Sequence, residues 1–596
     1  MERYDVIIVG SGAAGLSAAL RATKNGLSVL IVEKAHQYGG TSATSGGVLW
    51  IPNHGLTAHG DSREKALQYL ANISRGPVRR ERQEAFVDAG PRLVRFLAEL
   101  GLPLSPISGY PDYFSEVDGA HPGRALIAPD MDGALLGEDF YTLREAPLRF
   151  RLLTRFSLGM GDIGILALRL PGWRRLVVRI LWKYWSDIGW RIKTHRDRRL
   201  TMGNALIGGL RKLLNDRKVP LWLGTALEKL VLENGRVVAA ELVRHGHRVT
   251  VHARYGIIIA AGGFEWSQPM RDKYLTLPGS IKWSATPENA NTGDCTRAAQ
   301  AIGAATEFME TMWWNPNMVL PVIDAPNIEM VHIMTFDHTR PHTVLVNQNG
   351  VRFVNECRSY DRVGTAMLED YRHTGGANAP CWMIFDVRYR RQFPTGGLMP
   401  SVIMPDRKIP KDWWDHYIFR ANTIAELAAK IELDPSVLAE TIRKMNEYAK
   451  TGVDTEFGRG NYDYDKFVGV PTNKPNPCIG SIEQPPFYAV PVLLGDIGSK
   501  GGLKADARAR VLDEKDQPIP GLYAVGNASG AMSGDAYPGA GGTIGPAMVF
   551  GFIAADDIQD HAVGVDSKNQ TVSQPAAARV GHAPVVRITD RALRPH

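Results

Sequence analysis

The 596-residue sequence predicts an α/β fold with a parallel sheet and a βαβ unit at its N-terminus. The first observation is a glycine-rich turn between two apolar, strand-like segments within residues 4–35. The second and third are distant strand-like segments, at 255–267 and 519–539, which both run into small residues. Strands that alternate with helices favour a parallel sheet, to which these segments would contribute strands.

The N-terminal segment YDVIIVGSGAAGLSAALRATKNGLSVLIVEKA has the order strand, glycine-rich turn, alanine-rich helix and second strand. Gly10 allows the tight turn, Gly12 allows a pyrophosphate to approach the backbone, and Gly15 allows the helix to pack on the strand. The helix N-terminus supplies free amides and a partial positive charge. Glu33, at the tip of the second strand, suits the paired hydroxyls of an adenosine ribose. These features predict a Rossmann-like dinucleotide site.

A second stretch of small residues, GGTSATSGGVLWIP at 39–52, follows the acidic residue. It suits a loop that runs beneath the pyrophosphate and a flavin ring, which favours FAD over NAD, whereas the alternative interpretation is an ordinary loop. The sequence has no second glycine fingerprint that could hold NAD(P)H. We therefore expect reoxidation by a quinone or another carrier.

Composition argues against several other kinds of site. The four cysteines stand far apart without C-x-x-C spacing, so we expect neither a disulfide framework nor a metal site. No apolar run reaches the ~18 residues of a spanning helix, and the N-terminal residues lack the pattern of a secretory signal. We therefore expect a cytoplasmic protein. The net charge of +7 is accompanied by no recognisable nucleic-acid-binding motif, so no nucleic acid partner is expected.

A basic insert is expected at 141–200. Between Arg144 and Arg199 there are fourteen Lys and Arg against four Asp and Glu, an excess larger than that of the whole chain. Within it, 173–192 predicts a basic amphipathic helix with several tryptophans, which is typical of an interfacial membrane anchor at the inner face of a membrane. The alternatives are a helix packed on its own protein and a dimer contact. The apolar residues at helical spacing are Trp173, Leu176, Val177, Ile180, Leu181, Tyr184 and Ile188.

The N-terminal unit and the two distant strands resemble the flavoprotein family of fumarate reductase and succinate dehydrogenase. Within it, YPGAGGTIGPAMVFGFIAA, GDIGSKGGLKAD and VNQNGVRFVNECRSY are most similar to the 3-ketosteroid dehydrogenase branch, and the resemblance covers 1–120 and 200–560. It implies a discontinuous FAD-binding domain of the glutathione-reductase type, into which an α+β substrate domain is inserted as a catalytic cap over the flavin. We expect FAD-binding parts at 1–140, 201–310 and 481–563, the insert at 141–200, the substrate and cap domain at 311–480 and a flexible tail at 564–596.

The family binds FAD covalently only where a histidine occupies the loop near Ser45. This chain has no histidine there, so the resemblance implies non-covalent FAD. The expected FAD contacts are Gly10, Gly12, Ala14, Gly15, Glu33, Lys34, Gly40, Thr41, Ser42, Ser45, Gly46, Gly47, Ala226, Ala261, Gly262, Asp294, Gly526, Asn527, Gly542, Thr543 and Ile544.

The C-terminal stretch GDAYPGAGGTIGPAM carries Tyr537 and no arginine, although carboxylate-reducing relatives hold their substrate with arginine in the corresponding stretch. A ring ketone is the better fit. Dehydrogenation beside a ketone removes one hydrogen as a proton and the other as a hydride to the flavin. The proton is acidic only if the enolate oxygen is stabilised, which a tyrosine hydroxyl and a backbone amide can do. The resemblance implies that Tyr537 and Gly541 have this role.

The base in this branch is a tyrosine that follows an Asn-Glu motif, and the run from Asn355 to Tyr360 fits it. Because an unperturbed tyrosine has a pKa of ~10, the base needs a neighbour that stabilises its ionised form. In the family a second tyrosine from the early FAD-domain region does this. The segment GYPDYF offers Tyr113, with Tyr110 as the alternative.

We therefore expect a FAD-dependent dehydrogenase of a hydrophobic cyclic ketone, with 3-ketosteroid Δ1-dehydrogenation as the leading hypothesis. Alternatives of the same class are a 3-ketosteroid Δ4-dehydrogenase, a desaturase of another cyclic ketone and a flavin ene-reductase. A hypothesis of another class is a membrane-docked FAD-binding subunit without turnover.

Overall fold

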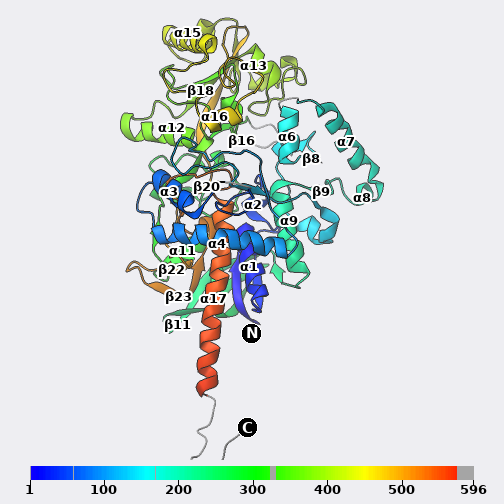
Figure 1. Ribbon diagram of the computed structural model, residues 1–596, viewed down its shortest axis with the longest axis vertical. Coiled ribbons are helices and arrows are strands. Elements are labelled where there is room, and N and C mark those ends of the chain that lie inside the picture. The colour runs from blue at the N-terminus through cyan, green and yellow to red at the C-terminus, as the bar shows by residue number, and fades with distance from the viewer. Residues whose placement is uncertain (1, 58–59, 168–169, 322–330, 573–596) are drawn as a thin grey trace, which may run out of the picture.

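The computed structural model describes residues 2–57, 60–167, 170–321 and 331–572. Its main sheet brings together strands from three distant parts of the chain (Figure 1). These strands are β1 (Glu2–Val9), β2 (Val29–Val32), β10 (Leu221–Trp222), β11 (Thr225–Glu233), β12 (Arg236–Arg244), β13 (His247–Ile259), β22 (Arg510–Leu512) and β23 (Pro518–Ala524). Their order is β10-β2-β1-β13-β12-β11, with β23 beside β13 and β22 beside β23. The central pairs around β1 are parallel, as the sequence predicts.

The main sheet is buried on both faces, which explains the continuous apolar sequence of β1. Val6 and Ile8 face one hydrophobic cluster, and Ile7 and Val9 face another. Parallel sheets covered on both sides have such unbroken apolar strands. The helices beside the first cluster are α1 (Ala13–Lys24), α4 (Arg80–Glu99), α9 (Met202–Asn215) and α17 (Ile544–Val572), and α11 (Asp294–Gln300) lies beside the second.

Helix α17 packs closely on α1 and so joins the C-terminal part of the chain to the N-terminal unit. The Ser17 hydroxyl donates to the carbonyl of Met548 at 3.0 Å. A Cβ at Gly551 would lie 2.5 Å from the carbonyl oxygen of Ala14, so only glycine permits this approach. The helix continues to Val572, beyond the start of the tail expected at 564–596, and 573–596 lie outside the described residues.

The hairpin between β11 and β12 is confirmed. Its two-residue turn consists of Asn234, with φ 49°, and Gly235, with φ 74°. Positive φ at both positions is the requirement of the type I′ turn that joins twisted strands. The register of the hairpin pairs Glu233 with Arg236 directly across the turn.

A second, antiparallel sheet forms the core of the upper domain in Figure 1. Its strands are β15 (Met312–Val319), β16 (Val331–Ile333), β17 (Thr343–Val346), β18 (Cys381–Asp386), β19 (Phe419–Ala421) and β20 (Phe487–Ser499). The order is β16-β15-β20-β18-β17, with β19 beside β20. Strand β20 lies after residue 480, where the second domain is expected to end, but it hydrogen-bonds to β15 and β18 rather than to the main sheet. This strand therefore belongs to the second domain.

The basic insert forms a lobe at one side of the molecule (Figure 1). Its elements are β7 (Arg151–Leu152), β8 (Phe156–Ser157), α6 (Met160–Ala167), α7 (Trp173–Ser186) and α8 (Ile188–Lys193). The single helix expected over 173–192 is wrong, because the backbone at Asp187 leaves the helical conformation with ψ 63°. Leu176, Ile180 and Tyr184 are buried in a small cluster with β8, as the predicted stripe requires, whereas Ile188 is exposed.

Smaller elements complete the described structure. Among the described residues, no helix is both long and apolar enough to cross a bilayer. The other helices are α2 (Gly40–Ala43), α3 (Arg63–Ile73), α5 (Asp139–Thr142), α10 (Gln268–Tyr274), α12 (Tyr360–Thr374), α13 (Val387–Gln392), α14 (Ile424–Lys430), α15 (Pro435–Thr451) and α16 (Asp463–Val468). The short strands are β3 (Val48–Trp50), β4 (Ser105–Pro106), β5 (Ala125–Ile127), β6 (Met131–Asp132), β9 (Arg199–Leu200), β14 (Thr306–Glu307) and β21 (Gly502–Leu503).

Candidate active site

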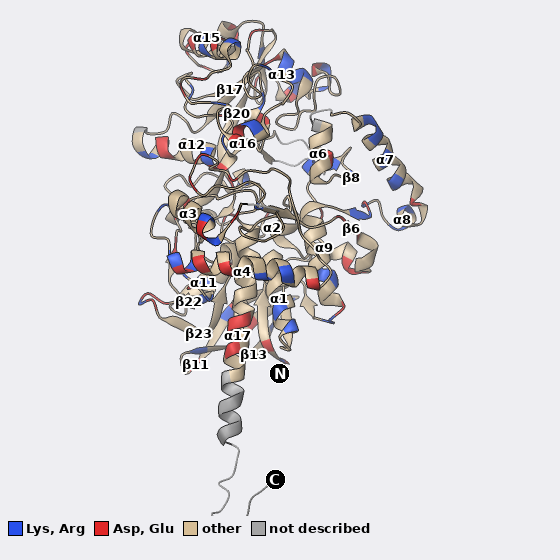
Figure 2. Ribbon diagram, in the orientation of Figure 1, with Lys and Arg blue, Asp and Glu red and all other residues tan. Residues whose placement is uncertain are grey.

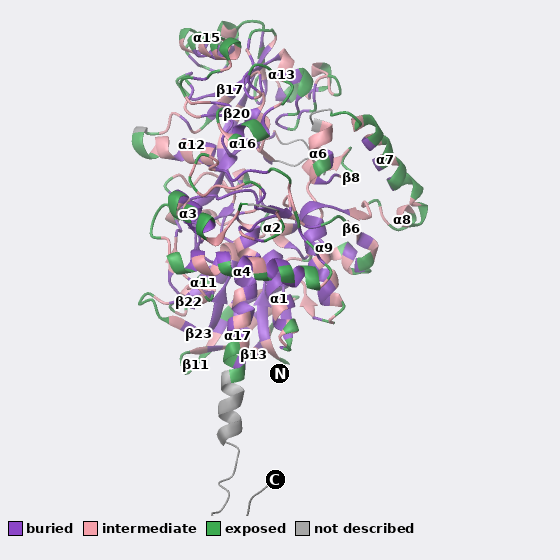
Figure 3. Ribbon diagram, viewed as in Figure 1, coloured by how far each residue is buried: buried purple, intermediate pink, exposed green. Residues whose placement is uncertain are grey.

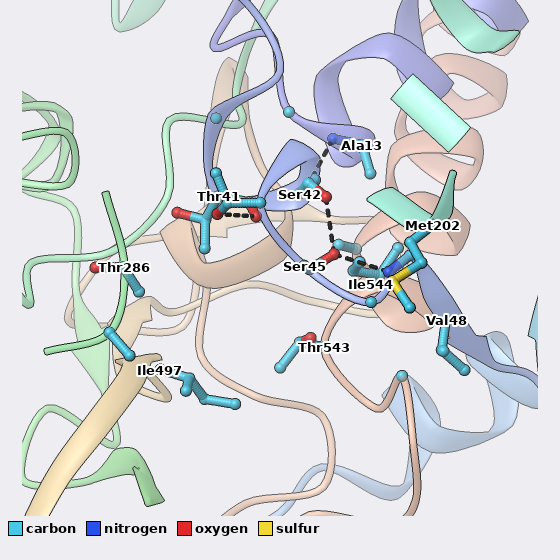
Figure 4. Close-up of a pocket in the computed structure, with 18 of the residues that line it drawn as sticks. Ala13, Thr41, Ser42, Ser45, Val48, Met202, Thr286, Ile497, Thr543 and Ile544 are labelled. Carbon is cyan, nitrogen blue, oxygen red and sulfur yellow. Dashed lines mark hydrogen bonds between the residues drawn. The ribbon is translucent and has the colours of Figure 1, made fainter. Parts of the chain in front are cut away.

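A cavity of about 910 Å³ is lined by segments of the main sheet, the second domain and the basic insert. Ligand pockets span roughly 300–1,000 Å³, so this one can hold a large ligand. The β1–α1 turn, the loop after α2 and the loop before α17 form one part of its wall. The start of α12, the segment around β16 and α6 form other parts of the wall. Figure 4 shows part of the lining, in which Thr41, Ser42 and Ser45 follow one bend of the chain.

The β1–α1 turn has the close backbone approach that a pyrophosphate site requires. Gly10 has φ 110°, and a Cβ there would lie 2.3 Å from the carbonyl oxygen of Ala260. The next glycine, Gly12, precedes α1, whose first amide at Ala13 donates to the Ser42 hydroxyl at 3.2 Å (Figure 4). The helix N-terminus and these small residues leave backbone donors facing the cavity, an arrangement that fits a diphosphate.

Glu33 lines the cavity at the end of β2 and is held in a fixed position. Its carboxylate accepts from the Ser11 hydroxyl at 2.6 Å and from the Ala35 amide at 2.9 Å. Beside it, Lys34 forms a 3.1 Å ion pair with Asp294. The two acidic groups thus lie at the cavity wall at this end, where the hydroxyls of a ribose would find acceptors.

Most of the predicted FAD contacts line this one cavity. They are Gly10, Gly12, Ala14, Glu33, Lys34, Gly40, Thr41, Ser42, Ser45, Gly46, Gly47, Ala261, Gly262, Asp294, Gly526, Asn527, Thr543 and Ile544. The positions come from four separate regions of the sequence, and the fold brings all of them to the lining of one cavity. Across the described part of the chain, no three His, Cys, Asp or Glu side chains are grouped so as to hold a metal ion.

Three predicted contacts do not belong to the described lining: Gly15, Ala226 and Gly542. A Cβ at Gly15 would lie 2.1 Å from the carbonyl oxygen of Gly10, so Gly15 permits helix packing instead. Ala226 lies between two lining residues of β11, because alternate residues of a strand face opposite sides. The Gly542 amide donates to Gly539 at 2.9 Å and closes the turn before α17.

Sequence reasoning missed two arginines of the basic insert, Arg144 and Arg149, which also line the cavity. Burial lowers the pKa of Arg144, and its Nε has no hydrogen-bond partner in the described structure. Burial lowers the pKa of Arg149 to about 10, and its side chain donates to the Thr44 carbonyl at 3.2 Å. The excess of basic residues in the insert was the available signal, but it was interpreted as a surface feature.

Three tyrosines from distant segments of the chain, Tyr113, Tyr360 and Tyr537, meet in the lining of the same cavity. The Tyr113 hydroxyl donates to the Tyr360 hydroxyl at 3.2 Å. The ring centroid of Tyr537 lies 5.7 Å from that of Tyr360 and 5.3 Å from that of Tyr113. All three rings are buried. Tyr110 also lines the cavity, but its ring packs on Phe467 at 4.6 Å, so the structure pairs Tyr113 with Tyr360.

Burial dominates the acidity of this cluster. Loss of solvent raises the pKa of Tyr360 well above its ordinary value, and the hydrogen bond from Tyr113 acts in the opposite direction. Burial likewise raises the pKa of Tyr113, with the surrounding tyrosines adding to the increase. Burial also raises the pKa of Tyr537, and its contacts with Tyr360 and Thr543 oppose this effect. Tyr537 is therefore a neutral donor at neutral pH.

The loop before α17 presents one backbone amide beside Tyr537. Gly541 has φ 91°, and a Cβ there would lie 2.4 Å from the carbonyl oxygen of Val48. The Gly541 carbonyl accepts from the Trp50 amide at 3.0 Å, which ties this loop to β3. In the described structure the Gly541 amide donates to no protein group, although the residue lines the cavity. A hydroxyl and a free amide on one wall are suited to bind a carbonyl oxygen.

A buried lysine connects the segments that carry Tyr360 and Tyr537. Lys500 donates to the Asp361 carboxylate at 3.1 Å and to the Asp535 carbonyl at 2.6 Å. Its ammonium group lies 5.1 Å from the ring centroid of Trp313, which in turn packs on Tyr537. Burial raises the pKa of Asp361 to about 6, although Lys500 opposes the increase.

Comparison with known proteins identifies related sequences over nearly the whole chain. The FAD binding domain family matches residues 5–544. The 3-oxosteroid 1-dehydrogenase of Mycobacterium tuberculosis is 38% identical over 94% of this chain and 99% of its own. The 4-oxocyclohexanecarboxylate 2-dehydrogenase of Sinomonas cyclohexanicum is 33% identical, and 94% of each chain is covered. The structure of 3-ketosteroid Δ1-dehydrogenase from Sterolibacterium denitrificans with 1,4-androstadiene-3,17-dione superposes with a TM-score of 0.89 at 42% identity, covering 94% of this chain and 100% of that one.

Proposed function

Because the chain belongs to the FAD binding domain family, in the branch of the 3-oxosteroid 1-dehydrogenases, we propose that it introduces the Δ1 double bond into 3-ketosteroids. The observation that carries the proposal is the meeting of Tyr113, Tyr360, Tyr537 and the Gly541 amide in the cavity that also holds the dinucleotide turn. FAD, when bound, accepts a hydride from the substrate. The residues of the chain bind the ketone, remove a proton and exclude water.

The ketone oxygen is bound between the Tyr537 hydroxyl and the Gly541 amide. The hydrogen bonds from both donors strengthen as negative charge develops on the oxygen. In other enzymes each such donor lowers the activation free energy by roughly 3–4 kcal/mol. Tyr360, in its ionised form, removes the proton from the carbon next to the ketone. Tyr113 donates to the Tyr360 oxygen and so stabilises that ionised form against the cost of burial. The proton passes to Tyr360, and the carbon–hydrogen electron pair becomes the enolate.

Anaerobic mixing of the oxidised holoenzyme with 4-androstene-3,17-dione tests this function. We expect bleaching of the flavin absorbance and formation of 1,4-androstadiene-3,17-dione. Bleaching with a saturated 3-ketosteroid and a Δ4 product would instead support the 4-dehydrogenase. Reaction only with a small cyclohexanone would support a different ketone desaturase, and oxidation of reduced flavin by an enone would support an ene-reductase. A protein that binds FAD but is never bleached would fit the non-catalytic subunit.

We further propose that FAD is bound non-covalently and that a quinone reoxidises it. The loop of 39–52 offers hydroxyls and glycines but no histidine to the cavity, which supports the first point. Acid precipitation should leave the flavin in the supernatant; flavin in the pellet would contradict non-covalent binding. Reduced enzyme mixed with a soluble naphthoquinone should reoxidise much faster than with NAD⁺, and equal rates would contradict a quinone acceptor.

A second proposal is that the lobe of α6–α8 docks on an anionic lipid surface at the inner face of a membrane. Figure 2 shows basic residues along α7, and Figure 3 shows its exposed outer side. Trp182 and Trp185 are 69% and 57% exposed, and Ile192 of α8 is 82% exposed. Exposed tryptophans interspersed with uncompensated cations suit the headgroup region of a bilayer. The basic residues of α7 without an ion pair in the described structure are Arg174, Arg175, Arg179 and Lys183.

Co-sedimentation with vesicles tests the lipid proposal. We expect binding to phosphatidylcholine vesicles that contain phosphatidylglycerol and weaker binding at high salt, because the charges are screened. Replacement of Trp182 and Trp185 by serine should reduce binding. Val402 and Ile403 are equally exposed on the cap domain, so their replacement by serine is the matched control. Equal binding by all variants, or a stable dimer through α7, would contradict the proposal.

A further inference from the structure

The cavity has a second group of polar side chains, separate from the tyrosines and from the dinucleotide turn. His332 lies on β16, and Thr335, Asp337 and Arg340 follow it along the chain. Their neighbours in the lining are mostly apolar: Phe336, Phe393, Pro394, Phe467 and Val468. A mainly apolar wall with a few convergent polar groups is typical of a ligand subsite.

Arg340 has no counter-ion in this group. The nearby carboxylate of Asp337 is bound by His332, with 2.8 Å between Nε2 and Oδ1. Within the described structure, the hydrogen bonds of the Arg340 guanidinium go only to the carbonyls of Val468, at 2.7 Å, and Gly469, at 3.4 Å. Burial lowers the pKa of Arg340, because the charged form loses its solvation. A largely desolvated cation that forms no ion pair among the described residues is costly, and an anion bound in the cavity would reduce that cost.

The guanidinium is fixed in position before any ligand arrives. It lies over the rings of Phe336 and Phe393, at 5.7 and 5.9 Å from their centroids. The carbonyl of Arg340 accepts from the buried Arg459 side chain at 2.8 Å, which holds its backbone. A guanidinium held this way loses little freedom on binding a carboxylate, which it can contact with two parallel hydrogen bonds.

Phe336 connects this group to the reaction centre. On one side its ring packs against the hydrophobic cluster that contains Tyr113, Tyr360 and Tyr537. On the other side it packs against the Arg340 guanidinium. A substrate whose ketone lies at Tyr537 would therefore pass an apolar surface before it reaches a cation, so the cavity suits a molecule that is apolar in the middle and polar at both ends.

We propose that Arg340 binds a carboxylate at the end of the substrate remote from the reacting ketone. The inference rests on the proposed ketosteroid dehydrogenation and names its substrates more closely, as 3-ketosteroids that carry an acid group on a shortened side chain. A small cyclic keto acid would present the same carboxylate, and the experiment separates the two sources by the size of the ring system.

The test compares 3-oxo-4-androstene-17β-carboxylic acid with its methyl ester, which has the same ring system and no charge. In the wild type we expect a lower KM for the acid than for the ester. Arg340→Met should raise the KM for the acid roughly 10- to 100-fold, as expected for loss of a hydrogen-bonded charge pair. The KM for the ester should change less than about twofold. Arg340→Lys keeps the cation and should restore part of the preference for the acid.

Arg390→Met is the matched control. Arg390 is also buried and also donates to backbone carbonyls, but it lies outside the described cavity lining. A purely structural role of Arg340 would make both variants change acid and ester alike, which would overturn the inference. If Arg340→Met does not fold, the inference is tested by comparing the KM for the acid with the KM for the ester in the wild type and in Arg340→Lys. Equal KM values for acid and ester in both proteins would reject the inference.

The two proposals fail in different ways. If 4-androstene-3,17-dione and the ester bleach the flavin and the acid shows no Arg340-dependent advantage, only the carboxylate inference is wrong. If no steroid bleaches the flavin, the proposed function is wrong. In that case, turnover of 4-oxocyclohexanecarboxylate that depends on Arg340 would show that Arg340 binds a small keto acid. It would contradict the inference that the substrate is a steroid acid.

Discussion

The hydroxyl of Tyr113 lies 3.2 Å from the hydroxyl of Tyr360, and this hydrogen bond joins a loop of the FAD-binding region to the first residue of α12 in the second domain. Both phenols are buried, and burial raises the pKa of each. The hydrogen bond is the contribution that favours an ionised Tyr360, because a donor stabilises the charged form of its partner. The pair therefore sets how readily the proposed base loses its proton.

Tyr113→Phe should shift the pH dependence of flavin reduction to higher pH. The substitution removes the hydrogen bond that lowers the pKa of Tyr360, so that pKa rises and a smaller fraction of the base is ionised at any given pH. Stopped-flow reduction by 4-androstene-3,17-dione between pH 7 and 10.5 measures the shift. An unchanged profile would falsify the assignment of Tyr113 as the partner of the base.

Tyr360→Phe should slow flavin reduction by a factor of roughly 10²–10⁴, because general base catalysis contributes about that much. FAD content and steroid binding should be retained, since the ring remains in the cavity wall. Tyr417→Phe is the control, because Tyr417 is equally buried and donates to the Gly396 carbonyl outside the described cavity lining. Comparable slowing in both variants would assign the effect to packing.

Tyr537→Phe should lower the rate of flavin reduction by roughly 10²–10³, because one of the two donors to the enolate oxygen is lost. The KM for steroid should change much less than kcat, because the donor acts mainly on charge that develops in the transition state. Steady-state kinetics with an artificial acceptor, together with spectroscopic titration of the oxidised enzyme by product, separates the two. A rise in KM with an unchanged kcat would show that Tyr537 contributes only to binding.

Lys500→Met should destabilise the protein more at pH 8 than at pH 5. The pKa of Asp361 is already raised to about 6 by burial, and loss of Lys500 raises it further. At pH 8 the folded variant must bury an unpaired carboxylate or take up a proton, whereas at pH 5 the carboxyl is protonated at no such cost. We expect a loss of about 3–5 kcal/mol at pH 8, measured by denaturant unfolding.

The exposed pair of Lys444 and Glu456 supplies the control for this experiment. Lys444→Met should leave the free energy of unfolding nearly unchanged at either pH, since surface pairs contribute little. A Lys500→Met variant that loses equal stability at pH 5 and pH 8 would contradict the proposed dependence on Asp361.

Much of the cofactor side of the cavity could be predicted from the sequence, because its geometry depends on local backbone requirements. Gly10 has the positive φ that its turn needs, and the Asn234-Gly235 hairpin forms where the turn residues predict it. Short motifs of this kind determine their own conformation. The position of Ala226 was not predictable in the same way, since a shift of one residue along a strand moves a side chain to the other face.

The remaining features could not be predicted, because they depend on contacts between segments that are far apart in the sequence. The apolar run of β20 is compatible with either sheet, and only its hydrogen bonds to β15 and β18 place it in the second domain. The break at Asp187 between α7 and α8 is accompanied only by Gly189 in the first turn of α8, and a single glycine is also tolerated inside a helix. Arg340 and its neighbours carry no motif, and their convergence on the cavity is a property of the tertiary structure.

The C-terminal segment completes both the main sheet and the tyrosine cluster. Strand β23, which pairs with β13, and Tyr537 are both encoded after residue 517, although the partners they meet lie hundreds of residues earlier. Truncation before Pro518 would therefore remove, in one step, a strand of the main sheet and the tyrosine proposed to bind the ketone.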